Sequence, residues 1–372
     1  MSLVREGVHA GPSDRPLHGF ERRKLCRPLS LHGGGGWKLK GKISLAHGDG
    51  GELAHQLVRE VFVEAFGHEE QARWDAALLP LEGGDVAIST DSFVIKPLFF
   101  PGGDIGKLAV SGTVNDIAVS GAEPRFLTAG FILEEGFPVE DLRRIARSMA
   151  EEAKRAGVRI VAGDTKVVER GGADGLFVHT TGIGRLRPDR RLQPEQIREG
   201  DAVIISGTIG DHGIAVLAAR GEMGLSPGLF SDCASLSGMI SELLSTVRGV
   251  RIMRDPTRGG LATALVEICE DFRVTVQLDE AALPVRREVR GACDIFGFDP
   301  LYLANEGKVV LIVAQEDEEK VVKLLRGHPL GREAAVIGRV TGREQGRLLL
   351  RSTLGSTRRL SRMSGMMLPR IC

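Results

Sequence analysis

The chain ends in a cysteine, within the sequence Pro369-Arg370-Ile371-Cys372. Pro369 fixes one backbone torsion and removes a hydrogen-bond donor, so the sequence predicts a short extended arm that could enter a pocket. A thiol on such an arm could carry a covalently bound group between sites. The plainer alternative is a frayed terminus that happens to end in cysteine, because chain ends tolerate change.

A second recurring feature is a carboxylate next to a glycine or at the end of a predicted strand. Glycine lets backbone amides approach a phosphate closely, and carboxylate oxygens suit Mg²⁺ on nucleotide phosphates. One such pair alone is more typical of a turn or helix cap. Together they predict a nucleotide and metal site. The motifs are Gly84-Asp85, Thr90-Asp91, Asn115-Asp116, Gly163-Asp164-Thr165-Lys166, Gly210-Asp211-His212-Gly213, Asp255-Pro256-Thr257-Arg258-Gly259-Gly260 and Asn305-Glu306-Gly307-Lys308.

Asp116 differs from the other carboxylates because it lies inside a predicted helix, between Val114 and Ile117. A carboxylate there is costly unless a metal or a donor pairs it. Common nucleotide motifs are absent: the only Walker-like spacing ends in Ile43 instead of Ser or Thr, and no G-x-G-x-x-G opens a helix after a strand. A P-loop or Rossmann enzyme is therefore not expected.

Alternating helices and strands must position these residues, which predicts an α/β fold. The first half is expected to contain a helix opened by glycines 48, 50 and 51, a strand over 86–90, helices over 102–120 and from 139, a buried strand over 159–162 and a hairpin arm over 176–181. After a polar linker at 185–198, the second half is expected to contain strands over 202–206, 274–278, 309–314 and 335–340 and helices from 214, over 232–246, from 261 and over 317–326.

Length and composition agree with two domains between flexible ends. The boundaries expected are a disordered basic tail over 1–42, domains over 43–190 and 191–351, and a mobile tail over 352–372 that carries the terminal cysteine. The 1–42 segment contains nine Lys and Arg against three Asp and Glu. A solvated leader or a mis-set start codon explains this segment more simply than nucleic-acid binding.

Charge and cysteine usage exclude several classes of protein. Lys and Arg together number 49, as do Asp and Glu, so no overall field favours nucleic acid or membrane surfaces. The five cysteines are odd in number and form no C-x-x-C pair, which fits a reducing cytoplasm better than disulfides or zinc. No apolar run approaches the ~20 residues of a membrane span.

The motifs resemble those of the HypE family of hydrogenase maturation proteins, in order from about Ile43 to Cys372. That family belongs to the superfamily of aminoimidazole ribonucleotide synthetase, selenophosphate synthetase and thiamine-monophosphate kinase. The aspartate motifs specify only the superfamily, and the Pro-Arg-Ile-Cys terminus points to HypE. The resemblance implies a two-domain α/β (α+β) fold like that synthetase, with an N-terminal domain that forms a dimeric β-barrel and a C-terminal α/β domain.

What the resemblance implies for function is an ATP-dependent carbamoyl dehydratase, a lyase. The carbamoyltransferase HypF loads a carbamoyl group on Cys372, and ATP then dehydrates the thiocarbamate to a thiocyanate that supplies cyanide to NiFe hydrogenase. Phosphorylating the thiocarbamate oxygen turns it into a good leaving group, and the nitrogen must lose two protons to a base. Implied partners are a second copy of the chain, HypF and the iron-carrying HypC-HypD complex, and the nucleotide is expected near the dimer seam.

Roles follow from the matching motifs. Besides Cys372, Lys166 is expected to meet the transferring phosphoryl group, Glu306 to act as the base, and His212 to be the second candidate base. The expected ligands of Mg²⁺ are Asp85, Asp91, Asp116 and Asp255, and the expected ATP-binding residues are Asn115, Gly163, Asp164, Thr165 and Lys166.

Two other functions stay open at the level of sequence. One is another ATP-dependent synthetase or kinase of the superfamily acting on a free small molecule, which should survive removal of Cys372. The other is a non-catalytic scaffold that presents Cys372 to iron-carrying partners, with the aspartates as caps and turns. Binding and slow turnover of Mg-ATP would separate an enzyme from a scaffold.

Overall fold

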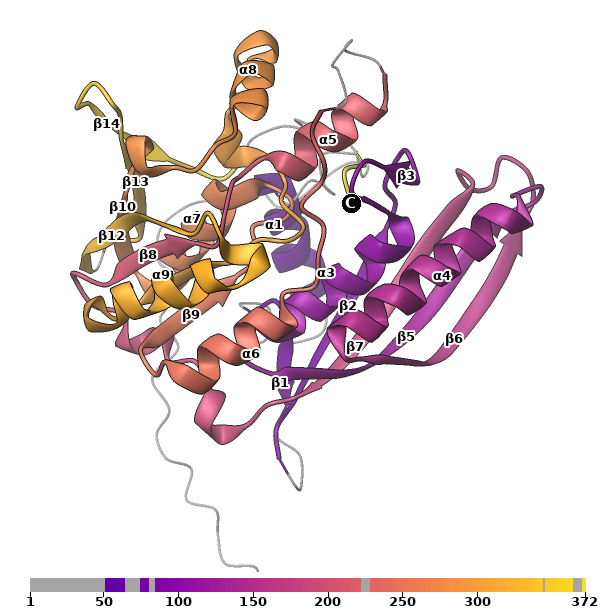
Figure 1. Cartoon of the computed structure of the whole chain (residues 1–372), viewed down its shortest axis with the longest axis horizontal. Coiled ribbons are helices and arrows are strands. Elements are labelled where there is room, and N and C mark those ends of the chain that lie inside the picture. Colours follow the sequence, from indigo (N-terminus) through magenta and orange to yellow (C-terminus); the bar gives the residue numbers. More distant parts are fainter. Residues whose placement is uncertain (1–50, 64–73, 80–83, 222–227, 344, 364–369) are drawn as a thin grey trace, which may run out of the picture. The chain divides into compact units, whose positions relative to one another are not determined.

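The computed structural model describes residues 51–63, 74–79, 84–221, 228–343, 345–363 and 370–372, all within one compact unit, Leu39–Cys372 (Figure 1). The expected basic tail, the glycines at 48 and 50, and Pro369 lie outside the described residues. Where the structure describes the chain, no helix is long and apolar enough to cross a membrane.

The first half of this unit is built on a five-stranded sheet. Its order is β1-β2-β7-β5-β6, with β5 and β6 parallel and the other neighbours antiparallel. Helix α3 contacts β2, β5 and β7, and α4 lies beside α3. The elements are β1 (Ala77–Leu79), β2 (Val86–Phe93), α3 (Ile105–Val119), β5 (Glu123–Glu134), α4 (Val139–Ala156), β6 (Arg159–Val168) and β7 (Leu176–Arg185). A short helical stretch, α1 (Glu52–Leu57) with the π-helical turn Val58–Val63, precedes the sheet, and a two-stranded ribbon, β3 (Phe99–Phe100) and β4 (Gly103–Asp104), precedes α3.

The two helices of this half differ in what they bury. The Asp104 carboxylate caps α3 by accepting hydrogen bonds from the amides of Gly106 and Lys107, at 2.7 and 3.1 Å. Nearly all residues of α3 are buried, whereas α4 buries only one side and ends at Gly157, whose φ of 72° suits a left-handed C-cap. The buried helix α3 is thus the element that can carry polar groups into the interior.

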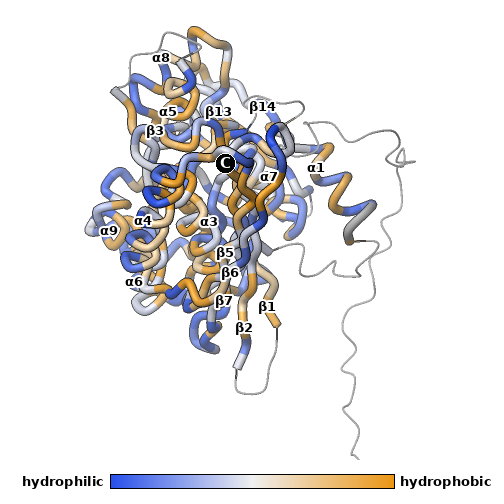
Figure 2. Tube along the Cα trace, turned by 90° about the vertical axis from the view of Figure 1, so that its right-hand side faces the viewer, coloured by the Kyte–Doolittle hydropathy of each residue, from blue (hydrophilic) through white to orange (hydrophobic). Residues whose placement is uncertain are grey.

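The other face of the five-stranded sheet carries exposed apolar side chains. Phe126, Ile132 and Ile183 have exposed fractions of 41%, 44% and 38%, and β1 is coloured as hydrophobic in Figure 2. The prediction of a buried strand over 159–162 is wrong for this chain, because β6 forms the sheet edge and is exposed along almost its whole length. An apolar run in the sequence predicts that a strand is covered. It does not tell whether the same chain or another molecule covers it.

The second half is built on a seven-stranded sheet of order β14-β13-β10-β12-β8-β11-β9. Strands β8 and β11 are wholly buried and read as unbroken apolar runs, as expected when both faces of a sheet are covered. One core holds α7 and another holds α6 and α9, each packed with strands of this sheet. The elements are β8 (Ala202–Ile205), α5 (Asp211–Ala219), α6 (Ser237–Thr246), β9 (Val250–Arg254), α7 (Gly260–Phe272), β10 (Val274–Asp279), α8 (Arg287–Phe296), β11 (Val310–Val313), α9 (Glu318–Gly327), β12 (Ala335–Arg343), β13 (Arg347–Arg351) and β14 (Thr357–Leu360).

The mixed α/β fold is as predicted, but several elements had no clear signal in the sequence. Strands β5, β9, β13 and β14 and helix α8 were not anticipated, and β14 lies inside the segment expected as a tail. The domain boundaries stay predictions. The dimeric barrel also stays a prediction, because the described residues of one chain give the first half an open five-stranded sheet.

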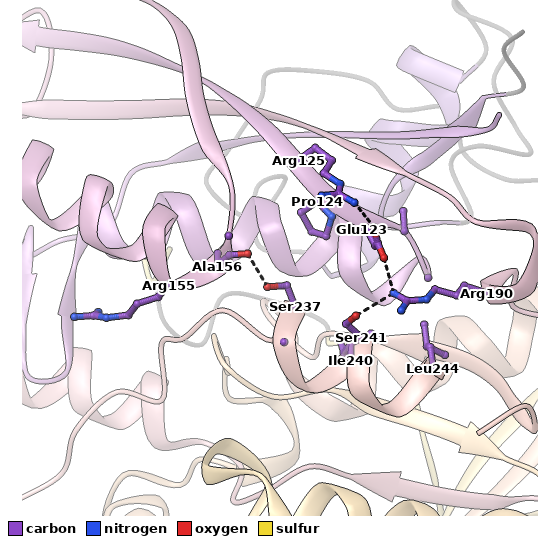
Figure 3. A pocket seen from close by; sticks show the side chains of 14 residues that line it. Glu123, Pro124, Arg125, Arg155, Ala156, Arg190, Ser237, Ile240, Ser241 and Leu244 are labelled. Carbon is purple, nitrogen blue, oxygen red and sulfur yellow. Dashed lines mark hydrogen bonds and ion pairs between the residues drawn. The ribbon is translucent and has the colours of Figure 1, made fainter. Parts of the chain in front are cut away.

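A polar pocket of about 320 Å³ joins the two halves (Figure 3). The buried guanidinium of Arg190 donates through Nη1 to the hydroxyl of Ser241, at 3.0 Å, and pairs with Glu123 at 3.2 Å. Ser237 donates to the carbonyl of Ala156, at 3.3 Å. These contacts connect α6 to the start of β5 and the end of α4, which indicates a structural role for the residues around this pocket.

Candidate active site

Three of the predicted carboxylates lie in one neighbourhood, near the junction of β2, α3 and the end of β9, although they do not all converge on one point. Alternation along β2 turns Ser89 and Asp91 toward α3. The hydroxyl of Ser89 donates to Asp116 Oδ2 at 2.5 Å, and that of Thr113 donates to Asp91 Oδ2 at 3.1 Å. Asp91 and Asp116 lie within hydrogen-bonding reach of each other once one of them is protonated, and Asp255 is buried close enough to influence both.

Burial and like charge act together on this cluster. Burial is the main cause that raises the pKa of Asp116 well above its usual value, and the charges of Asp91, Asp255 and Asp75 raise it further. The pKa of Asp255 is raised in the same way, by burial and then by Asp75 and Asp91. A cation at this point would relieve both the desolvation and the repulsion.

The donor set fits Mg²⁺ that is shared with a phosphate ligand. Asp255 Oδ2 is buried and has no hydrogen-bond partner, so it is an oxygen left for a ligand. Among the residues that the structure describes, no three His, Cys, Asp or Glu side chains already converge on one point. Oxygens from a nucleotide would therefore have to complete the coordination, as Mg²⁺ commonly requires.

Asp75 was missed by the sequence analysis. It pairs with the buried Arg254, which also holds Glu267 at 3.2 Å. Burial raises the pKa of Asp75 to about 6, against the lowering effect of Arg254. No motif marks Asp75, and the one available signal was Arg254, which ends strand β9 directly before the Asp255 motif.

The structure does not bring Asp85 to the cluster. Asp85 precedes β2 and pairs with Arg191, whereas Asp91 lies six residues further along the extended strand. At about 3.3 Å per residue the two carboxylates are roughly 20 Å apart. Both sit near glycine or a predicted strand end in sequence, yet Asp85 lies just before β2 and Asp91 lies in its second half.

The Gly163–Lys166 segment also lies away from the cluster within one chain. Asp91, Thr180, Ala129 and Gly163 pair in one row across the sheet, so Gly163 is three strands from Asp91, roughly 14 Å. Lys166 is mostly exposed and pairs with Asp164 at 2.6 Å. Thr165 lies between them on the same exposed strand.

Asn115 is buried with both ends of its amide engaged. Its Nδ2 donates to the carbonyl of Ala234 at 3.1 Å and to that of Glu306 at 3.5 Å, and its Oδ1 accepts from the Leu236 amide at 2.8 Å. The nucleotide contact expected for Asn115 stays a prediction. These bonds give it a structural role, because they connect α3 to two loops of the second half.

Glu306 is held rigidly at the edge of the cluster. The Asp232 carboxylate accepts from the amides of Glu306 and Gly307, at 3.1 and 3.2 Å, and from Lys308 Nζ at 3.1 Å. A Cβ at position 307 would lie 1.9 Å from the Asp232 carbonyl oxygen, so only glycine fits. Glu306 Oε1 is buried without a partner, and burial raises its pKa well above normal, with Asp255 and Asp232 adding to the rise.

The C-terminal cysteine is inserted into this same site. The Val94 amide donates to the Cys372 carbonyl at 3.2 Å, and only 7% of the cysteine is exposed. Burial raises the pKa of the thiol to about 12; a hydrogen bond from Arg258 opposes the rise, and the charges of Glu306 and Asp91 add to it. The thiol is therefore protonated at neutral pH, among the acidic residues.

His212 is a tail-binding residue in this structure, not a free base. Its Nε2 lies 2.8 Å from the Ile371 carbonyl oxygen, and its Nδ1 lies 2.8 Å from the Ser231 hydroxyl. A carbonyl can only accept, so Nε2 carries the proton and Nδ1 accepts from Ser231. With both nitrogens engaged, His212 cannot take a proton from the substrate while the tail is bound.

Arg258 and Arg220 are two further site residues that sequence reasoning did not single out. The Arg258 side chain forms a hydrogen bond with the Cys372 thiol. Arg220 Nη2 donates to the Arg370 carbonyl at 2.9 Å. Arg258 lies inside a motif quoted above, which was a usable signal. Arg220, at the end of α5, had none.

Comparison with known proteins identifies the class to which this fold and site belong. Residues 73–186 match the N-terminal domain of AIR synthase related proteins, and residues 198–351 match the C-terminal domain of that family. The chain is 48% identical over 333 residues to carbamoyl dehydratase HypE of Azotobacter vinelandii. The match covers 89% of this chain and 98% of that protein.

Two solved structures are similar along almost their whole length. A crystal structure of a HypE-HypF complex matches with 49% identity and a TM-score of 0.78, over 82% of this chain and 99% of the other. A crystal structure of HypE in complex with ATP matches with 44% identity and a TM-score of 0.75, over 89% of this chain and 100% of the other. The chain belongs to the HypE family of carbamoyl dehydratases.

Proposed function

We propose that this protein uses ATP to dehydrate a carbamoyl group carried on Cys372, giving a thiocyanate that supplies cyanide to the iron of NiFe hydrogenase. The observation that carries the proposal is the position of the terminal thiol, buried beside Arg258 and among Asp91 and Glu306. The similar HypE structure with bound ATP supports the nucleotide.

The residues present can serve each step of that reaction. Transfer of the γ-phosphoryl group to the thiocarbamate oxygen produces ADP, and the C–O bond then breaks with phosphate as the leaving group while the nitrogen loses two protons. Glu306 is the proposed base, since it is a fixed carboxylate with an unpartnered oxygen near the sulfur. Its raised pKa makes its ionised form a stronger base.

We assign Mg²⁺ to the carboxylates of Asp91, Asp116 and Asp255. Bound there with ATP, the ion would neutralise phosphate charge in the transition state. Asp85 is left out of this assignment because of its distance from the other three. The role of the three carboxylates is to hold the ion and, through it, the γ-phosphoryl group beside Cys372.

A homodimer is the second part of the proposal. The support is the outer face of the sheet, where Phe126, Ile132 and Ile183 are exposed near β6, the edge strand of the sheet that the described residues form, a surface typical of an interface. Lys166 pairs with Ile132 in register and so lies on that face. Lys166 could therefore reach a phosphoryl group only in a second copy, and we propose that it does.

The burial and raised pKa of the Cys372 thiol indicate that a partner protein must load it outside the pocket. A thiol with a pKa of about 12 is a poor nucleophile at neutral pH, so the buried position does not suit loading. We propose that HypF carbamoylates Cys372 outside this pocket, as the similar HypE-HypF complex supports, and that a HypC-HypD complex receives the cyanide. A cytoplasmic location stays a prediction, and a reducing compartment would keep this thiol free.

Intact mass spectrometry of the full chain tests the proposal. During incubation with HypF, carbamoyl phosphate and ATP, the protein should first gain a carbamoyl group and should then, as ATP is consumed, lose the mass of one water. Cys372→Ala should show neither change. A water loss that persists in Cys372→Ala would contradict the carrier, and ATP turnover independent of Cys372 would favour an enzyme acting on a free small molecule.

A further inference from the structure

The last three residues are held mainly through their backbone. The carbonyl oxygen of Arg370 accepts from the Lys96 amide at 3.2 Å and from Arg220 Nη2 at 2.9 Å. The next carbonyl, of Ile371, accepts from His212 Nε2, and the last, of Cys372, accepts from the Val94 amide. Each of the three carbonyls therefore has a donor, and two of these donors come from the ends of one helix, α5.

The side chain of Arg370 adds polar contacts of its own. Its Nε donates to the Val94 carbonyl at 2.8 Å, and its Nη1 forms an ion pair with Asp174. Asp174 also pairs with Lys96 at 3.2 Å, and Arg220 Nε donates to the Lys96 carbonyl at 2.9 Å. Asp174 and Arg220 therefore fasten the tail to the segment just after β2.

These contacts are separate from the reaction chemistry. Asp174 and Arg220 are not among the carboxylates and cations that surround the sulfur, and they bind Arg370, two residues before the thiol. The Asp174–Arg370 pair is also partly exposed, with side-chain exposed fractions of 48% and 27%. A pair of that kind is weak, which suits a contact that must form and break.

We infer that Asp174, Arg220 and His212 form a receptor for the chain's own C-terminus, and that the strength of this receptor sets how often Cys372 occupies the catalytic pocket. They are positioning residues, since each acts on the thiol through the tail backbone or Arg370. A weaker receptor leaves the thiol outside for longer, which favours loading and slows dehydration. The consequence for catalysis rests on the proposed function, whereas occupancy of the pocket can be measured without it.

Alkylation of Cys372 in the ligand-free full chain measures that occupancy. The protein is treated with iodoacetamide, and modification is quantified on the C-terminal peptide, so that the buried Cys233, Cys269 and Cys293 do not contribute. Loss of one partly exposed ion pair in Asp174→Asn should raise the alkylation rate of Cys372 roughly threefold. Arg220→Gln should raise it by at least as much, because it loses bonds to two carbonyls.

Asp279→Asn is a matched control. Asp279 also pairs with one arginine, Arg351, at 2.7 Å and with similar exposure, but on the seven-stranded sheet. In Asp279→Asn, Cys372 should be alkylated at the same rate as in the parent. In Asp174→Asn, a second change of Arg370→Gln should add little, since the two side chains form one contact. Independent effects of the two changes would show that Asp174 does not act through Arg370.

A second measurement connects the receptor to the reaction. In single-turnover dehydration of the carbamoylated protein at saturating ATP, Asp174→Asn should be slower than the parent with an unchanged half-saturating ATP concentration, and Asp174→Glu should recover part of the rate. Equal alkylation rates in Asp174→Asn, Arg220→Gln and the parent would overturn the receptor. Faster alkylation with an unchanged dehydration rate would overturn its influence on catalysis. Absence of dehydration in the parent itself would overturn the proposed function, while the alkylation result would still decide the receptor.

Discussion

Burial dominates the chemistry of the acidic residues at the site. Desolvation is the largest cause of the raised pKa of Asp116, Asp255 and Glu306, and neighbouring carboxylates add to each. A carboxyl whose pKa is higher in the folded state than in the unfolded chain contributes stability at low pH and loses it as the pH rises through that window. At neutral pH the ligand-free fold is thus weakened by the groups to which we assign the reaction.

Replacing Asp116 with asparagine should therefore separate stability from activity. Asp116→Asn keeps the volume and removes the charge, so we expect ATP turnover to be abolished while the melting temperature without ligand stays equal to or above that of the parent. The gain in melting temperature over the parent should grow from pH 5 to pH 8, because only the parent has a carboxyl to ionise. Thermal melts across pH and an ADP-release assay check this, and parental turnover in the variant would remove Asp116 from the metal site.

At the scale of elements, β5 and β6 carry the surface that the chain leaves open. Strand β5 has apolar side chains on the outer face, and the parallel pairing of β5 with β6 aligns Ile132 with Lys166. An apolar sheet face beside an edge strand is favourable only when something covers it. A second copy of the same face would do so with the same residues from both chains.

A charge in the middle of that face should break the dimer. We expect Ile132→Glu to shift the protein from dimer to monomer in analytical ultracentrifugation, because burying an unpaired carboxylate opposes association. Ile295→Glu is the matched control, since Ile295 is 73% exposed on α8, away from this sheet. A dimer of parental strength in Ile132→Glu would place the interface elsewhere.

At the scale of the molecule, the site exists only where the two halves meet. Asp91 and Asp116 come from the first sheet and its helix, whereas Asp255 and Glu306 come from loops of the second sheet. Asn115 connects the halves directly, with its amide bonded to the backbone at 234, 236 and 306. The position of Glu306 relative to Asp91 and Asp116 therefore depends in part on one buried amide.

Removing that amide should cost stability and disturb the site together. Asn115→Ala leaves buried backbone groups without partners, which costs on the order of 2–4 kcal/mol of the free energy of unfolding. Ser120→Ala in the same helix removes only a local bond to the Ile117 carbonyl and should cost much less. Urea denaturation of both variants is the measurement, and equal losses would show that Asn115 does not couple the halves.

Much of the chemistry was predictable from local patterns in the sequence. The alternation of β2, the buried helix around Asp116 and the terminal Pro-Arg-Ile-Cys are readable from spacing and residue type, and they predicted the carboxylate cluster and the tail that enters it. Spacing along the chain also places Asp85 directly before the strand that contains Asp91, so a separation of most of a strand length was predictable.

Tertiary structure alone decided which residues meet. Lys166 belongs to an edge strand three strands from the cluster, His212 is occupied by the Ile371 carbonyl, and Arg220 and Arg258 reach the tail from distant parts of the sequence. Local patterns specify the type of an element and which of its faces is buried. The order of strands in a sheet and the packing of loops at its edge depend on contacts between residues far apart in the chain, and such contacts leave no local pattern.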